Sequence, residues 1–304
     1  MGLAVAIQSL VDVAEDERLP ADLIADMQAR PGFAQAMRHS MEGTLRICRD
    51  DRAVFRIHKD SGHFVLGVLA LYLHVSGGLT LTRLQTLCVE AGLCSAGRAV
   101  AILVQLRLMG FVTALPRQGD GRVRRYDPTA QMAAAMRSRM RTDLESAALV
   151  EAHAAACLAR FDDDEIFFAF MRRFGKGLID AAALRDTDGP SLRMFSHHAS
   201  GMLVLYSIAL SGAPDDEAFP PVGPVRISLA GLSNAHGISR PHVRRLVTKA
   251  EAVGYLRRTE AANQGYLERA LRDELAAYFA ILFIGLGISA RAALEEMVAA
   301  RSAG

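Results

Sequence analysis

The sequence predicts a mainly α-helical protein of the α+β type, built from two consecutive units of the same design. The chain has 304 residues, about twice the length of a common domain. It also repeats itself at an interval of about 140 to 145 residues, the kind of self-similarity that defines an architecture. Its composition, 51% hydrophobic and 22% charged, is that of a folded globular protein. We therefore expect one unit in residues 1–158 and a second in residues 159–304, each with its own core.

Two pairs of segments carry the repeat. The apolar segment SGHFVLGVLALYL, residues 61–73, aligns with ASGMLVLYSIAL, residues 199–210. Further on, LQTLCVEAGLCSAGRAVAILVQLRLMGFV, residues 84–112, aligns with LAGLSNAHGISRPHVRRLVTKAEAVGYL, residues 229–256, with one residue inserted near Cys94. The matched register over this length favours an internal duplication over the alternative, two unrelated helical domains that share a chance pattern.

Helical stretches are expected on both sides of each copy. They lie at about residues 21–57 and 160–197 before the copies, and at about residues 129–158 and 266–300 after them. No Gly or Pro occurs around residues 151–164. We therefore expect continuous helix to join the two halves.

In the second copy, the sequence predicts two short helices separated by a tight turn. Gly237 suits the left-handed conformation that closes the first helix. Ser239 is placed to cap the second helix, and Pro241 stands in its first turn, where a missing amide hydrogen is harmless. The apolar residues of this second helix recur at spacings of three and four and predict one buried stripe, made of Val243, Leu246, Val247, Ala250 and Val253. The outer face carries polar side chains, which are Arg240, His242, Arg244, Arg245, Thr248 and Lys249.

This polar face is the arrangement needed to place a helix in the major groove of DNA. After the helix a strand begins, and Arg257 and Arg258 lead into a hairpin whose tip is expected at residues 263–265. Between residues 237 and 258, six Arg or Lys side chains face one acidic residue, Glu251, which gives a local charge of +5 in a chain whose net charge is +2. Positive charge is therefore concentrated where DNA phosphates would lie.

The segment ISRPHVRRLVTKAEAVGYLRR, residues 238–258, resembles the recognition helix and first wing strand of MarR-type winged helix-turn-helix transcriptional regulators. In the first half GDGRVRR, residues 119–125, followed by residues 127–129, resembles the basic wing of that family, with Asp120 and Arg122 at the positions of its usual Asp and Arg. The resemblance covers about 60 residues in each half. It implies a dimer with interlocking terminal helices and wings against the minor groove, here with both subunits fused into one chain as a pseudo-dimer. It also implies double-stranded DNA as partner and a small-molecule effector between the halves.

The two halves depart from the family pattern in different ways. The second wing lacks the Asp-x-Arg signature, whereas the first recognition helix has Val100 and Ala101 where the second has Arg244 and Arg245. We expect the second half to recognise the major groove and the first half to depend on its wing, so that the operator is asymmetric. The predicted DNA-binding residues are Ser239, Arg240, His242, Arg244, Arg245, Thr248, Lys249, Arg257 and Arg258 in the second half, and Ser95, Arg98, Gln105, Arg117, Arg122, Arg124 and Arg125 in the first.

Other functions fit parts of these observations. The first half could have lost DNA binding, so that its apolar helix face with Val104 meets a protein partner or another copy of the chain. The whole chain could be a replication initiator of the plasmid or phage type, or a winged-helix interaction module in which only the second half binds DNA. An enzyme is not expected, because the sequence has no phosphate loop followed by Lys, no GxSxG and no HExxH.

The titratable residues outside the repeat motifs are expected to have structural roles, in packing or at helix ends. His58 and His197 align across the repeat, but no Cys or carboxylate stands at a ligand spacing, so neither a metal nor a cofactor is expected. The acidic residues 162–165 suit the start of a helix. The four cysteines form no CxxC pair, and packing is the simpler interpretation of each. Redox sensing is the alternative for Cys48 and for Cys94, which precedes the first recognition helix.

The N-terminal sequence lacks a basic stretch followed by an apolar signal core. The longest uncharged apolar run, residues 276–290, has 15 residues and is shorter than the roughly 18 of a membrane-spanning helix. We expect this run to be a buried helix, the protein to be cytoplasmic, and no membrane partner.

Overall fold

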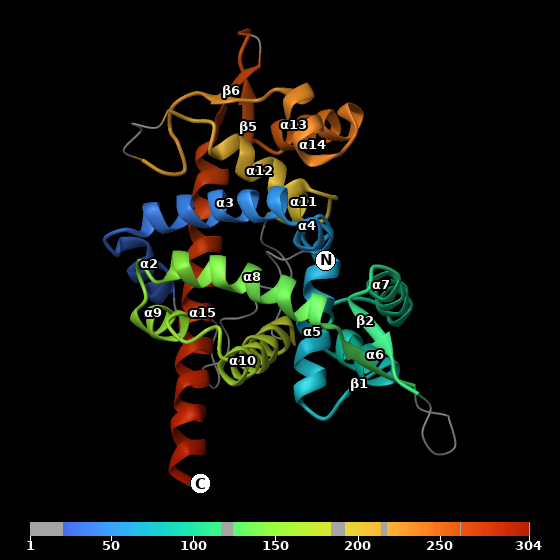
Figure 1. Cartoon of the computed structure of the whole chain (residues 1–304). Coiled ribbons are helices and arrows are strands. Elements are labelled where there is room, and N and C mark those ends of the chain that lie inside the picture. Colours follow the sequence, from blue (N-terminus) through green and yellow to red (C-terminus); the bar gives the residue numbers. More distant parts are fainter. Residues whose placement is uncertain (1–20, 117–123, 184–191, 214–217, 262, 304) are drawn as a thin grey trace.

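The computed structural model describes residues 21–116, 124–183, 192–213, 218–261 and 263–303 (Figure 1). The protein is mainly helical, with two small antiparallel sheets. Along the first half lie α2 (Ala21–Ala29), α3 (Phe33–Asp50), α4 (Arg52–His58), α5 (Ser61–Val75), β1 (Leu79–Thr80), α6 (Leu81–Glu90), α7 (Ala96–Leu108), β2 (Val112–Ala114), β3 (Arg125–Pro128), α8 (Ala130–Ala147) and α9 (Ala152–Leu158).

The second half has a closely similar order of elements. They are α10 (Asp164–Ala183), α11 (Arg193–Ser196), α12 (Gly201–Ala209), β4 (Val225–Arg226), α13 (Leu229–His236), α14 (Arg240–Ala252), β5 (Leu256–Arg258), β6 (Gln264–Leu267) and α15 (Arg269–Ala303). The strand order β1-β3-β2 of the first sheet matches the order β4-β6-β5 of the second. In each half the third strand in sequence therefore lies in the centre of its sheet.

The turns between the paired short helices form as their sequences predict. Gly237 ends α13 with φ 60°, and Gly92 follows α6 with φ 59°. Both values lie in the left-handed region that glycine tolerates best. The hydroxyl of Ser239 accepts a hydrogen bond from the amide of His242, and the hydroxyl of Ser95 accepts one from the amide of Arg98. The cap predicted at Ser239 is confirmed, and Ser95 caps α7 in the same way.

Two local predictions about helix ends are wrong. The halves are not joined by continuous helix, because α8 ends at Ala147 and α9 is a separate helix that ends before α10 begins. The carboxylate of Glu151 caps α9 by accepting from the amide of His153, which shows how an acidic side chain starts a new helix without Gly or Pro. Val253 is 55% exposed and not part of the buried stripe, because α14 ends one residue earlier and Val253 turns away as its C-cap.

The helices at the chain ends of the two halves interlock (Figure 1). Helix α10 of the second half packs against α5 of the first, and α3 of the first packs against α12 of the second. At the first crossing, a Cβ added to Gly175 would lie 2.6 Å from Cβ of Tyr72, so only glycine permits this approach. The buried side chains form one connected core that extends through both halves, in place of the two separate cores expected.

Helix α15 is the central support of the molecule. It packs against α2, α8, α9 and α10, and its consecutive residues 278–283 are all buried. Within the described residues, the segment Arg269–Ser302 is the one helix long and apolar enough to cross a membrane, and 67% of its most apolar window is buried inside the protein. The burial predicted for residues 276–290 is largely observed. The residues of this run that keep partial exposure are Ala276, Ala277, Ile284 and Ile288.

Candidate nucleic-acid interface

The clearest candidate surface is the outer face of α14. Its apolar residues Val243, Leu246, Val247 and Ala250 are buried. The opposite side chains are exposed, as predicted, and they are Arg240, Arg244, Arg245, Thr248 and Lys249. The stripe of apolar residues thus fixes the rotation of the helix and points the cations outward.

The four cations on α14 are electrostatically available. In the part of the chain that the structure describes, Arg240, Arg244, Arg245 and Lys249 have no carboxylate within ion-pair distance, whereas many arginines on the other elements are ion-paired. Exposed guanidinium groups without a protein partner can form paired hydrogen bonds with a guanine edge or with a phosphate. The surface therefore suits a polyanion.

His242 does not share this exposure. Its side chain is half-buried, its Nε2 atom is buried with no hydrogen-bond partner among the described residues, and its ring lies 5.9 Å from that of His198. Burial lowers the pKa of His198, and the nearby charge of Lys249 lowers it further. The structure therefore places His242 toward α11 and not on the outer face, which the helical periodicity alone could not reveal.

The corresponding helix α7 presents a different surface. Val104 is 50% exposed and Leu108 is 82% exposed, so the outer face of α7 is largely apolar. The amide oxygen Oε1 of Gln105, a predicted DNA contact, accepts a hydrogen bond at 2.7 Å from Nε2 of His63 on α5. Arg98 is exposed and lies 3.9 Å from the carboxylate of Asp60. These two polar side chains of α7 thus already have partners within the protein.

The segment predicted as the first wing corresponds to the paired strands β2 and β3. Arg124 and Arg125 are exposed, and the guanidinium of Arg124 lies 5.9 Å from the ring centre of Tyr126. Arg117 and Arg122, the other predicted contacts of this wing, lie outside the described residues. Two of the four predicted wing cations are therefore placed at the base of the hairpin.

The segment predicted as the second wing corresponds to the paired strands β5 and β6, and its two arginines have ion-pair partners within the protein. Arg257 bonds Glu268 at 2.8 Å and lies over the ring of Tyr266, and Arg258 bonds Glu251 at 2.6 Å. The hydrogen bond from Arg258 lowers the pKa of the Glu251 carboxyl, which keeps it charged. The local charge of +5 counted in the sequence is thus partly neutralised at the wing.

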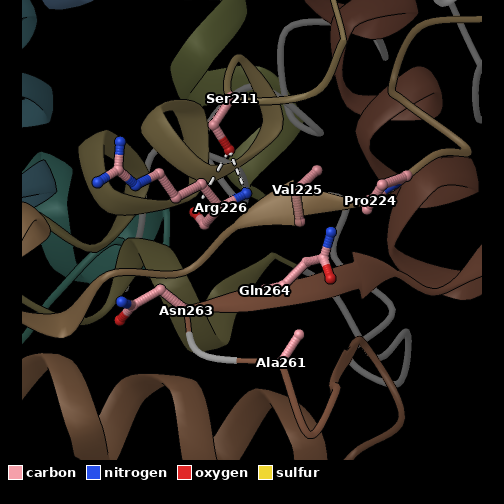
Figure 2. A pocket seen from close by; sticks show the side chains of 7 residues that line it. All are labelled: Ser211, Pro224, Val225, Arg226, Ala261, Asn263 and Gln264. Carbon is pink, nitrogen blue, oxygen red and sulfur yellow. Dashed lines mark hydrogen bonds between the residues drawn. The ribbon is translucent and has the colours of Figure 1, made fainter.

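Figure 2 shows a depression at the base of the second wing. It has a volume of about 450 Å³ and is lined by Arg226 of β4, by Asn263 and Gln264, and by Ser211 from the preceding loop. The Ser211 hydroxyl accepts a hydrogen bond from the amide of Arg226 at 2.7 Å and so fixes the edge of β4. Gln264 and Gly265 belong to β6 and not to the hairpin tip as expected, because the strand pairs from Gln264 onward. Arg226 is an exposed cation that was not predicted from the sequence, because a strand of two residues is too short to show an alternating pattern.

Helices α7 and α14 lie toward the same side of the molecule in Figure 1. In Figure 1, α7 and α14 are both at the right of the view, with α4 and α11 between them, and the two hairpins project at opposite ends. This placement follows from the interlocked packing of α3 on α12 and of α10 on α5.

A small polar cavity lies where the halves meet. It is lined by Thr44, His58 and Arg139 of the first half and His198 of the second, and each has a buried polar atom without a hydrogen-bond partner among the described residues. The space is about 20 Å³, enough for about one water molecule. His58 thus lines the interface between the halves, and across the cavity the second half contributes His198 in place of its aligned neighbour His197.

The acidic residues before α10 form ion pairs. Asp162 pairs with Arg141, Asp163 with Arg160, and Asp164 with Arg137. Among the described residues, no group of three or more His, Cys, Asp or Glu side chains could hold a metal ion. The start of α10 is therefore a salt-bridged surface against α8.

Comparison with models of protein families, with curated proteins and with solved structures found no match for this chain. The function proposed for this chain is therefore inferred from the geometry of its own residues.

Proposed function

We propose that this chain is a cytoplasmic transcriptional regulator that binds double-stranded DNA sequence-specifically through two winged helix-turn-helix units. The units arose by tandem duplication and act together as a single-chain pseudo-dimer of MarR type. The matched order of elements and the matched strand order of the two sheets support the duplication. The main support for DNA binding is the row of exposed, unpaired cations on α14, namely Arg240, Arg244, Arg245 and Lys249.

The proposal includes a division of labour between the halves. Helix α14 enters the major groove, where its arginines contact base edges. Helix α7 lies close to the next groove and adds apolar contacts, while Arg124 and Arg125 of the first wing contact the backbone or the minor groove. Because the two recognition helices differ in chemistry, the preferred operator is asymmetric.

One observation favours a second candidate function for the first half. Val104 and Leu108 of α7 are exposed apolar side chains on one helix face, a combination common in protein-protein contacts. In this alternative only the second half binds DNA, and α7 meets a protein partner. Absence of any footprint on the side of α7, with full binding through α14, would favour it.

Regulation by a small effector between the halves would require movement. The cavity around Arg139 and His58 has a volume of about 20 Å³, the space of one water molecule. An effector of several heavy atoms therefore has to open the contact between the halves around Arg139 and Tyr206 before it can bind there. Such opening would change the spacing of α7 and α14, which links the cavity to DNA binding.

The decisive experiment begins with selection of bound fragments from sheared genomic DNA of the source organism, followed by footprinting in moderate salt. A discrete asymmetric footprint of about two helical turns is the expected result. Binding that is uniform along DNA and sensitive to salt, or no binding, contradicts the proposal.

Variants then assign the contacts. Arg244→Ala is expected to weaken operator binding about 10-fold to 100-fold, because a base contact contributes about 1–3 kcal/mol. Arg124→Ala is expected to weaken binding less than Arg244→Ala does, and by about the same factor on all DNA sequences. Arg301→Ala removes an exposed Arg at the far end of α15 and serves as the control that should leave binding unchanged. Equal losses for Arg244→Ala and Arg301→Ala would exclude α14 as the recognition helix.

A further inference from the structure

The helix-turn-helix of the first half contains a pair of cysteines that the second half lacks. Cys88 lies in the last turn of α6, and Cys94 directly precedes Ser95, the cap of α7. The amide of Cys94 donates to the carbonyl of Cys88 at 3.2 Å, and each thiol lies near enough to shift the pKa of the other. The two residues are thus neighbours in the folded turn, as the short reach of a disulfide requires.

The two sulfur atoms are chemically unequal. The hydrogen bond from the Cys88 thiol lowers the pKa of Cys94 to about 7, against the opposing effect of burial, and the charge of Arg98 lowers it further. The same hydrogen bond and burial raise the pKa of Cys88. Cys94 is also the more accessible of the two. Cys94 therefore has the properties of an attacking thiolate, and Cys88 those of a resolving thiol.

The second half shows what this turn needs for folding alone. The residue that corresponds to Cys88 is Ser233, whose hydroxyl donates to the carbonyl of Ile238 at 2.6 Å and closes the turn. Cys94 has no counterpart there, because it is the residue inserted in the first copy. A redox-inactive side chain is therefore sufficient for the turn, and the cysteine pair is an addition to it.

We propose that Cys88 and Cys94 are an oxidation site that forms a reversible disulfide in response to hydrogen peroxide or an organic hydroperoxide. The Cys94 thiolate attacks the peroxide, the O–O bond breaks, and hydroxide or alkoxide leaves with Cys94 as sulfenic acid. Cys88 gives up its proton and attacks the Cys94 sulfur, the S–O bond breaks, and water leaves. The two thiols lose two electrons and two protons in total, hydrogen peroxide becomes two molecules of water, and a cellular dithiol reverses the reaction.

The position of the pair connects this chemistry to α7. The disulfide would hold Cys94 against α6 and remove the negative charge beside Arg98, at the helix end that Ser95 caps. This consequence for DNA rests on the function proposed above, whereas the disulfide itself does not. The other cysteines differ, because burial raises the pKa of Cys48 and of Cys157 to about 12.

The chain offers a direct test by mass spectrometry. Trypsin cleavage after Arg83 and Arg98 releases one peptide, residues 84–98, that contains both cysteines of the pair and neither of the others. The full-length reduced protein is treated with a small excess of hydrogen peroxide, alkylated and digested without reductant. The peptide is expected to lose two hydrogen masses, to escape alkylation, and to regain both thiols with dithiothreitol.

Variants distinguish this route from general oxidation. Cys94→Ser should abolish the disulfide, and Cys88→Ser, which copies Ser233 of the second half, should leave a sulfenic acid on Cys94 that dimedone traps. The double variant Cys48→Ser/Cys157→Ser should form the disulfide as the natural chain does. Circular dichroism checks that each variant is folded, and Cys88→Ala replaces Cys88→Ser if the latter is not.

Two results would overturn the proposal. One is that the peptide keeps two alkylatable thiols at peroxide concentrations that already oxidise Cys48 or Cys157. The other is that the Cys88→Ser variant gives no dimedone adduct on Cys94. DNA binding of the reduced and oxidised protein is measured in parallel. Loss of DNA binding in both states counts against the proposed function only, because the peptide mass reports the disulfide independently.

Discussion

Helices α7 and α14 occupy the same place in the two halves but have different chemistry. Both are 13 residues long and both begin at a serine cap. Their inner faces are equally buried, with Leu106 and Leu246 completely excluded from solvent. Their outer faces differ, since α14 carries exposed cations that have no carboxylate partner among the described residues, and α7 carries exposed Val104 and Leu108. The comparison teaches that packing constrains the inner face alone, so the outer faces can differ in chemistry.

A second difference lies at the contact between the halves. The amide of Thr129 donates to the carbonyl of Phe111, which lies between α7 and β2. In the same way, the amide of Glu268 donates to the carbonyl of Tyr255, which lies between α14 and β5. Counted from these matched positions, Arg139 of α8 corresponds to Tyr278 of α15, and the two side chains lie close together. Arg139 and its partner Asp143 are only 3% and 2% exposed. One half thus contributes a buried ion pair where the other contributes an aromatic residue.

The largest expected effect tests this buried pair. Arg139→Ala should lower the free energy of unfolding by about 3–5 kcal/mol, because it leaves Asp143 charged and buried without a counterion. Tyr278→Phe, at the matched position, removes only a hydroxyl that bonds Tyr206 and should cost about 1 kcal/mol. Urea denaturation measures both. Equal losses would show that the difference between the halves has no energetic importance.

The double variant Arg139→Met/Asp143→Leu sharpens that result. It removes both charges and keeps the volume, so it should recover most of the stability lost by Arg139→Ala. Failure to recover would mean that packing around Arg139, and not its charge, holds the halves together.

The next effect is a loss of stability in acid. Burial lowers the pKa of His58 well below 6.5, helped by the charge of Arg139, and burial also lowers the pKa of His236 in the second half. The folded state keeps both rings neutral, whereas the unfolded chain protonates them as the pH falls below about 6.5. The unfolded state then binds more protons, so the stability is complete above this pH and declines below it.

Denaturation at a series of pH values between about 7.5 and 5 checks this expectation. A stability that is constant in this range, or that rises as the pH falls, would contradict it. His58→Gln and His236→Gln, measured separately, show which half supplies more of the pH dependence.

Smaller effects are expected at the two helix caps. Ser95→Ala and Ser239→Ala should each cost about 1 kcal/mol, because each removes the acceptor of a helix amide, and the corresponding glycine variants should cost only a few tenths. Thermal or chemical unfolding measures the losses. A clearly larger cost for one cap would show that the two halves depend on these turns to different degrees.

The smallest effect concerns the wings. Arg125→Gln in the first wing should reduce the slope of log affinity for DNA against log salt concentration by about 1. The double variant Arg258→Gln/Glu251→Gln in the second wing removes a paired cation together with its partner, so the net charge does not change and the slope should stay nearly constant. An equal change in both cases would mean that Arg258 leaves Glu251 to contact phosphate.

The sequence by itself determined the local design of each unit. Local interactions explain the features that were predicted correctly, namely the glycine and serine at each tight turn, Pro241, and the apolar stripe of α14. Because these features depend on residues close in the chain, their effect can be predicted without tertiary structure. The exposed cations of α14 follow from the same periodicity. The Cys88 and Cys94 pair is separated by few residues, but only the folded turn shows that the two thiols meet.

Tertiary structure decided what depends on distant residues. It broke the predicted linker helix at a cap formed by Glu151, turned His242 toward His198, and paired the arginines of the second wing with Glu251 and Glu268. It also merged the two expected cores by packing α3 on α12 and α10 on α5. These outcomes depend on which surfaces meet across the chain, and a local pattern of apolar and charged residues carries no information about that choice.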